Sequence, residues 1–213
     1  QVPEGMLNAL ATTGMVADTV RHVGGEHVHV TTLMGPGVDP HLYKASAGDI
    51  HRLSRADVIF YSGLHLEGKM VEVLSKIART GKPTYAVSEE IPDERIRASQ
   101  QYEGFPDPHI WFDVELWSET VDVVAEKLSE IKPKNAAEFA ANAAAYKQQL
   151  IELDAYCRRR IAEIPEEQRI LITAHDAFSY FGAAYGIRVV GLQGINTSSE
   201  YGIADVQRLV RLI

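Results

Sequence analysis

The feature that most constrains the fold is a stretch of unusual length with a helical composition, residues 133–164. After its first residue, Pro133, it contains no Pro and no Gly, and Ala, Glu, Gln, Leu and Arg dominate it. A helix of about thirty residues rises about 1.5 Å per residue and spans roughly 45 Å. Most globular helices are shorter, and the Ala-rich positions do not keep the a/d repeat of a coiled coil. We therefore expect a rigid spine that joins two lobes.

Before the spine, short apolar runs alternate with amphipathic patterns. The pattern predicts strands at 7–12, 27–34, 57–63 and 83–88, and helices at 14–25, 47–56, 68–80 and about 115–131. This order predicts an α/β fold with a parallel sheet and helices on both of its faces. The polar stretch 89–108 is a long loop for a compact domain, and such loops are usually functional or mobile.

After the spine, the sequence predicts only a small second unit. A strand begins at 169 and runs into a loop and helix by 178, another strand covers 187–194, and a helix covers 200–213. A sheet of two strands rarely stands alone, so we expect this lobe to be truncated. The expected organisation is an N-terminal metal-binding lobe (1–132), the spine (133–165) and a partial C-terminal lobe (166–213).

Composition excludes several classes of function. The 213 residues are 46% apolar and carry a net charge of −8, and no basic cluster occurs beyond residues 157–160, so a nucleic-acid binder is not expected. No apolar run approaches the length of a membrane span. The single cysteine, Cys157, allows no internal disulfide. Neither a P-loop nor a dinucleotide fingerprint is present.

One short motif occurs twice, as "DPHLY" at 39–43 and "DPHIW" at 107–111. His41 and His109 each follow a predicted strand and loop, and His175, in "TAHDAF", lies directly at a strand end. Ligands of open α/β sheets bind beyond the carboxyl ends of strands. A single loop histidine is usually a surface residue, but the repeat and the third histidine favour a shared metal site.

The Asp-Pro pair before each repeated histidine has a mechanical interpretation. Proline fixes its own φ and restricts the residue before it, so the histidine leaves a stiffened turn. We expect Asp39 and Asp107 to accept hydrogen bonds from loop N–H groups or from an imidazole. Ligands that are held in place in this way suit a metal site.

The other five histidines are less specific. His27 and His29 alternate in a predicted strand, where an auxiliary site is a minor alternative. His22 and His51 lie on predicted helices and are expected to be solvated. His65 follows a strand, in "GLHLEG", and is a weaker candidate for lining the same cleft.

Several motifs together resemble one protein family: "TTGMVADTVRHVGG", "LMGPGVDPHLYKASAGDI", "ADVIFYSGLHLEGKM", "DPHIWFDVELW", "TAHDAFSYF" and "GLQGINTSSE". They are similar to the TroA-like zinc/manganese solute-binding proteins of bacterial ABC importers, and the resemblance covers nearly the whole chain. It implies two (β/α)₄-type lobes joined by a rigid helix, with one metal ion as cargo in the cleft between them.

Carried over motif by motif, the resemblance implies that His41, His109 and His175 are metal ligands. The family's fourth ligand is an Asp or Glu from a late loop, which we expect beyond residue 213. Three imidazoles and a carboxylate suit tetrahedral Zn²⁺, whereas Mn²⁺ prefers more oxygen ligands. Zinc-dedicated members often have a His-rich loop between the first two ligands. Residues 89–108 contain no such loop, so this sequence departs from that subgroup. The three-imidazole donor set still favours Zn²⁺, with Mn²⁺ next.

The resemblance also implies partners and a location. We expect a monomer that docks on the membrane subunits of an ABC permease, in the periplasm or at the outer face of the cytoplasmic membrane. An exported, lipid-anchored precursor is compatible with this expectation.

Two other classes of function remain open from the sequence. A zinc-dependent hydrolase or lyase also uses three histidines and a water, with Asp176 or Glu200 as the general base. An adhesin is a third class, for which no residue pattern argues directly.

Overall fold

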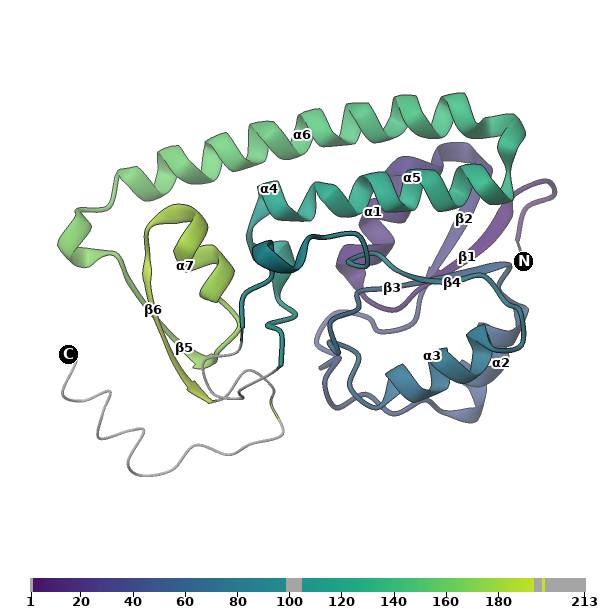
Figure 1. Cartoon of the computed structure of the whole chain (residues 1–213), viewed down its shortest axis with the longest axis horizontal. Coiled ribbons are helices and arrows are strands. Elements are labelled where there is room, and N and C mark those ends of the chain that lie inside the picture. Colours follow the sequence, from purple (N-terminus) through teal and green to yellow (C-terminus); the bar gives the residue numbers. More distant parts are fainter. Residues whose placement is uncertain (1, 99–104, 194–196, 198–213) are drawn as a thin grey trace.

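The larger lobe is built on a four-stranded parallel sheet. The computed structural model describes residues 2–98, 105–193 and 197 (Figure 1). The strands are β1 (Leu7–Ala11), β2 (Val28–Thr32), β3 (Val58–Tyr61) and β4 (Thr84–Ala86). They lie in the order β2-β1-β3-β4, and every neighbouring pair is parallel. The two central strands, β1 and β3, are buried along most of their length, which explains their largely apolar sequences. The edge strands β2 and β4 are mostly half-buried.

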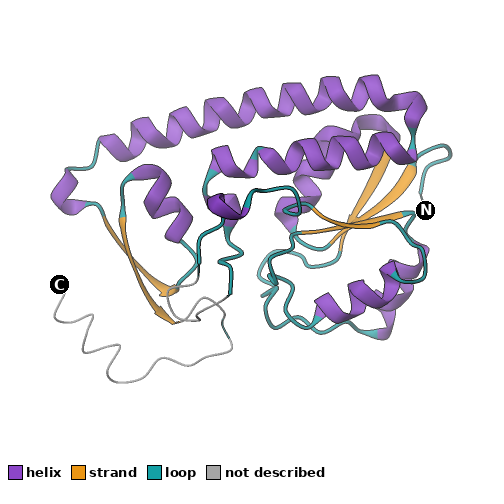
Figure 2. Ribbon diagram, in the orientation of Figure 1, coloured by secondary structure: helices purple, strands orange, loops and turns teal. Residues whose placement is uncertain are grey.

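Helices cover both faces of this sheet, as the sequence predicts (Figure 2). One face carries α1 (Gly14–Gly24), with α5 (Glu119–Ile131) and α6 (Ala136–Ala162) beyond it, and the other carries α2 (Ala47–Arg55) and α3 (Met70–Ala78). Successive side chains of β1 point to opposite faces of the sheet and pack in two different clusters of buried residues. Ala9 and Ala11 pack in the cluster that contains α1 and α5, whereas Leu10 packs with Leu53 and Leu74.

The strand order creates a crevice at one edge of the sheet. From β1 the chain crosses to β2 on one side, and it later returns to β3 on the other side of β1. Loops from neighbouring strands therefore diverge at the carboxyl ends of β1 and β3. This is the position at which open α/β sheets bind ligands.

The spine is present as α6, which runs from the first lobe to the second (Figure 1). It is slightly shorter than predicted, because Pro133 begins a 3-10 turn, η4 (Pro133–Asn135), before the α-helix starts. Its buried residues, Phe139, Ala143, Tyr146 and Leu150, share one face at helical spacing and pack on the first lobe.

The second lobe has two parallel strands, β5 (Ile170–His175) and β6 (Arg188–Gln193), joined through α7 (Ser179–Tyr185). Gly186 ends α7 in the left-handed conformation, with φ of 69°, as helix C-terminal glycines commonly do. The helix predicted at 200–213 lies outside the described residues. The domain boundaries given above remain a prediction.

Two local predictions need correction. The helix predicted from Glu115 is divided at Ser118 into α4 (Val114–Trp117) and α5, because Asp113 caps a separate first turn. His27 does not lie in β2 but in the 3-10 turn η1 (Gly25–His27). Within the described part of the chain, no helix has the length and hydropathy that a membrane span requires.

Candidate metal centre

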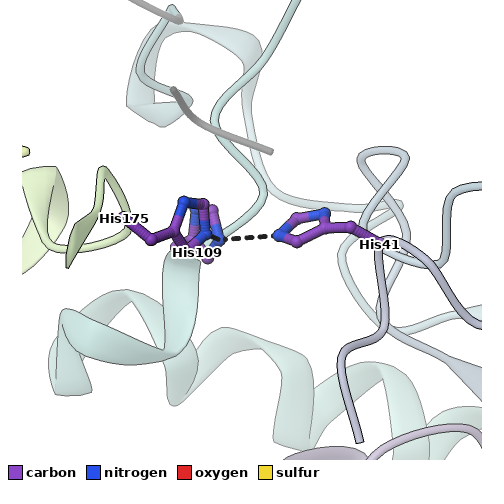
Figure 3. A group of neighbouring side chains, drawn as sticks. All are labelled: His41, His109 and His175. Atoms are coloured by element: carbon purple, nitrogen blue, oxygen red, sulfur yellow. Dashed lines mark hydrogen bonds between the residues drawn. The ribbon is translucent and has the colours of Figure 1, made fainter. Parts of the chain in front are cut away.

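Three histidines that are far apart in the sequence converge between the two lobes. His41 lies in the loop after β2, His109 precedes the 3-10 turn η3 (Ile110–Phe112), and His175 ends β5. The Nε2 atom of His109 lies 3.2 Å from Nε2 of His41 and 3.2 Å from Nε2 of His175 (Figure 3). The sequence predicted this set, and the structure brings all three together.

The spacing of these nitrogens fits a single ion. A tetrahedral Zn²⁺ with Zn–N bonds of about 2.05 Å holds its ligand nitrogens about 3.3 Å apart. The three ligand atoms all lie within 4.8 Å of one another. The rings meet edge to face rather than stacked, with interplanar angles of 65°, 71° and 84°.

The repeated Asp-Pro-His motif makes the same turn twice. Asp39 Oδ1 accepts a hydrogen bond from the His41 N–H at 2.9 Å, and Asp107 Oδ1 accepts one from the His109 N–H at 3.0 Å. Only the second turn also holds the ring, because Asp107 Oδ1 accepts a hydrogen bond from His109 Nδ1 at 2.7 Å. The aspartates thus make the contacts that the sequence predicts.

Asp107 also connects the two lobes. Its Oδ2 accepts a hydrogen bond from the Ser179 hydroxyl at 2.6 Å, and its backbone carbonyl accepts one from the Tyr180 hydroxyl at 3.0 Å. Ser179 and Tyr180 begin α7 in the second lobe. A candidate ligand from the first lobe is therefore positioned partly by side chains of the second lobe.

A buried carboxylate forms hydrogen bonds with the segments that follow the two central strands. Glu67 is fully buried at the carboxyl ends of β1 and β3. Its Oε1 accepts hydrogen bonds from the Thr12 hydroxyl at 2.7 Å and the Ser62 N–H at 2.6 Å, and its Oε2 accepts one from the Gly63 N–H at 3.3 Å. Burial raises the pKa of Glu67, and these hydrogen bonds oppose the rise. The sequence predictions did not include Glu67, because its partners come from segments that are distant in the sequence.

The residue after Glu67 contacts the backbone of a candidate ligand. Gly68 has φ of 46°, and a Cβ atom there would lie 2.2 Å from the His41 carbonyl oxygen. Only a residue without a side chain permits this approach. The segment that holds Glu67 therefore also fixes the position of the His41 loop.

The sequence matches the family described as zinc-uptake complex component A, periplasmic, over residues 10–213. The chain belongs to this family. The match begins within β1 and covers the rest of both sheets and the spine, so the resemblance noted in the sequence is confirmed.

Individual relatives of this zinc-uptake family extend the comparison. The manganese-binding lipoprotein MntA of Bacillus subtilis is 52% identical over 97% of this chain and 67% of its own length. The zinc-binding protein TroA of Treponema pallidum is 50% identical over 99% of this chain and 67% of its own length. The solved structure of TroA superposes with a TM-score of 0.93, covering 98% of this chain and 74% of that one. The Fe(III)-bound YtgA of Chlamydia trachomatis is 28% identical, with a TM-score of 0.85 and coverage of 96% and 75%.

These relatives bear on the expected fold and class of function. The fold predicted from the sequence is confirmed by the superposition with TroA. The relatives named here are metal-binding proteins, and the family is described as a periplasmic uptake component. The hydrolase or lyase alternative gains no support from them.

The charge state of His41 suits the binding of a cation. Burial, followed by the nearness of His109 and His175, lowers the pKa of His41 to about 4. The His41 ring is therefore neutral at pH 7 and offers a lone pair rather than a proton to an incoming cation.

The remaining candidates lie outside this group of three. His65 packs edge-on against Phe105, with ring centroids 6.3 Å apart, and does not join the three histidines in the described part of the chain. Asp176, next to His175, has its pKa raised by burial and by the charge of Asp107. Glu200 lies outside the described residues.

Proposed function

We propose that this chain binds one divalent transition-metal ion between its lobes, through His41, His109 and His175, and delivers it to the membrane permease of an ABC importer. The convergence of the three Nε2 atoms carries the proposal. The ion is cargo, so the protein acts by capture and release rather than by catalysis.

Zn²⁺ is the favoured cargo and Mn²⁺ the next. Three imidazole nitrogens form a donor set that tetrahedral Zn²⁺ accepts readily, whereas Mn²⁺ favours oxygen ligands and higher coordination. The names of the two relatives near 50% identity point to one metal each, zinc for TroA and manganese for MntA. Family membership alone therefore does not select the metal, and the donor set favours zinc.

A carboxylate is the expected fourth ligand, from a segment beyond residue 213. A carboxylate oxygen beside three imidazole nitrogens completes a tetrahedral zinc site, and its negative charge strengthens binding of the cation.

The proposal places the protein outside the cytoplasmic membrane, as a monomer that meets the permease at the membrane surface. The periplasmic description of the family and the lipoprotein name of MntA support this location.

Metal content tests the proposal. We would purify the untagged chain, add zinc, remove the excess and measure bound metals by elemental analysis. About one ion per chain is expected, with loss in His41→Ala and in His109→Ala. His51→Ala is the matched control, because His51 is exposed on α2 and away from the cluster. A wild type without metal, or equal metal in all four proteins, would contradict the proposal.

A further inference from the structure

A second group of metal-ligating side chains lies at the opposite edge of the first sheet. Glu26 and His27 belong to η1, directly before β2, whereas His41 follows the other end of the same strand. Glu138 lies in the first turn of α6. The group is therefore separated from the cleft by the length of the sheet.

The three side chains already face one another. Each offers one ligand atom, and the three atoms lie within 4.8 Å of one another. His27 Nε2 contacts Glu138 Oε2 directly. The His27 side chain is only 20% exposed and packs edge-on against Phe139, with ring centroids 6.0 Å apart, whereas the Glu138 side chain is 60% exposed. The imidazole is thus fixed, and a carboxylate that can move reaches it from the solvent side.

The two elements that supply these ligands are tied together independently of them. Asn142 of α6 donates a hydrogen bond from its Nδ2 to the carbonyl of Val23, at the end of α1, at 3.1 Å. Gly25 has φ of 52°, and a Cβ atom there would lie 2.9 Å from the Asn142 amide nitrogen. The backbone of η1 is therefore seated closely on α6, and the ligands are held near each other before any ion arrives.

We propose that Glu26, His27 and Glu138 form a second site for a divalent transition metal, with Zn²⁺ preferred and water completing the coordination. One imidazole nitrogen with two carboxylate oxygens is a donor set that zinc accepts, whereas Ca²⁺ and Mg²⁺ prefer oxygen alone. Binding replaces the direct contact of His27 with Glu138 by two bonds to the ion, and the exposed Glu138 side chain moves outward to make room.

The bound ion would join η1 to α6 and so fasten the spine to the first lobe. The carboxylates of this second site are well hydrated, and the site has a single imidazole. Zinc therefore binds more weakly here than at the three-histidine cluster. An ion at this site is not positioned for transfer between the lobes.

A zinc titration tests the second site. The metal-free wild-type chain is titrated with Zn²⁺ beyond two equivalents by isothermal calorimetry, so that binding in the cleft is recorded as the first event. A second, weaker event is expected, and His27→Ala and Glu138→Gln should each weaken it at least tenfold while the first event is unchanged. His22→Ala is the matched control, because among the described residues this exposed histidine pairs with a single carboxylate, that of Asp18. It should leave both events unchanged.

Absence of a second event in the wild type, or a second event that both variants retain, would overturn the inference. The unchanged first event shows that each variant is folded. The proposed function and the second site are tested independently. Binding in the cleft depends on His41 and His109, whereas binding at the second site depends on His27 and Glu138. A chain that lacks the first event but keeps a His27-dependent event would contradict the proposed function alone.

Discussion

The Asp107 carboxylate holds one residue, His109, at two points: it accepts hydrogen bonds from the backbone N–H at 3.0 Å and from ring Nδ1 at 2.7 Å. Because a carboxylate only accepts, Nδ1 must carry the proton. The lone pair of the neutral ring then resides on Nε2, the atom that faces His41 and His175. Asp107 therefore sets both the orientation and the tautomer of the central candidate ligand.

Replacing Asp107 tests this relationship. In Asp107→Asn the shape is kept but the charged acceptor is lost, so zinc affinity should fall about 10- to 100-fold. Asp39→Asn is the matched control, since Asp39 Oδ1 makes the backbone hydrogen bond to His41. It should weaken binding less. Competition titrations with a zinc-binding dye measure both, and equal losses would show that the ring contact has no special role.

The approach of Gly68 to His41 makes a second prediction. Gly68→Ala should weaken zinc binding as well as folding, because the new methyl group displaces the His41 carbonyl. Gly81→Ala shares the positive φ, at 87°, but a Cβ atom there meets nothing within 4 Å. It should cost only the backbone strain, about 1–2 kcal/mol of unfolding free energy. Urea unfolding and zinc titration of both variants separate strain from displacement, and unaltered zinc affinity in Gly68→Ala would contradict the account.

Glu67 should matter mainly for stability. Glu67→Gln replaces one acceptor oxygen by an amide that cannot accept, so one of the three buried donors loses its partner, at a cost of about 1–3 kcal/mol of unfolding free energy. Glu72→Gln, on the exposed face of α3, loses only an ion pair with Lys76 and should stay within about 0.5 kcal/mol. Chemical denaturation of the metal-free proteins measures both. Matching stabilities would mean that the buried network contributes little.

Acid should destabilise the first lobe through Asp49. Although burial alone would raise the pKa of this carboxyl, hydrogen bonds from Tyr43, Arg52 and Ser46 hold it well below its usual range. The unfolded chain therefore takes up the proton at a higher pH than the folded protein does. The stabilisation is complete above about pH 5 and is lost as pH falls below about 4.

This pH dependence is measurable with Asp49→Asn. The variant should be less stable than the wild type at pH 7, by about 1–3 kcal/mol, and should lose less stability between pH 5 and pH 3. Asp93→Asn, at an exposed position, is the control and should keep the wild-type slope. If the unfolding free energies of the wild type and Asp49→Asn fell equally between pH 5 and pH 3, Asp49 would not be the cause of the loss of stability in acid.

Much of the candidate site could be predicted because its residues follow strands. His41, His109 and His175 all come after apolar runs, and the carboxyl ends of parallel strands meet at one edge. The Asp-Pro steps signalled stiffened turns before His41 and His109. These are local signals, readable from a few residues each.

The contacts that could not be predicted depend on how distant segments pack. The hydrogen bond from Ser179 to Asp107 joins residues 72 apart and exists only because the lobes meet. His27 was placed wrongly in a strand, because the alternation of "HVHV" does not reveal that η1 turns the chain onto α6. Glu67 was missed because its partners, Thr12 and Ser62, directly follow β1 and β3, and the sequence does not state that these two strands are neighbours.

Crystals of the zinc-loaded chain, measured on both sides of the zinc absorption edge, test the central claim most directly. We expect an anomalous peak in the cleft about 2.0–2.1 Å from the Nε2 atoms of His41, His109 and His175. A cleft without an anomalous peak would contradict the proposed site. So would a peak that lies beyond bonding distance of any of the three Nε2 atoms.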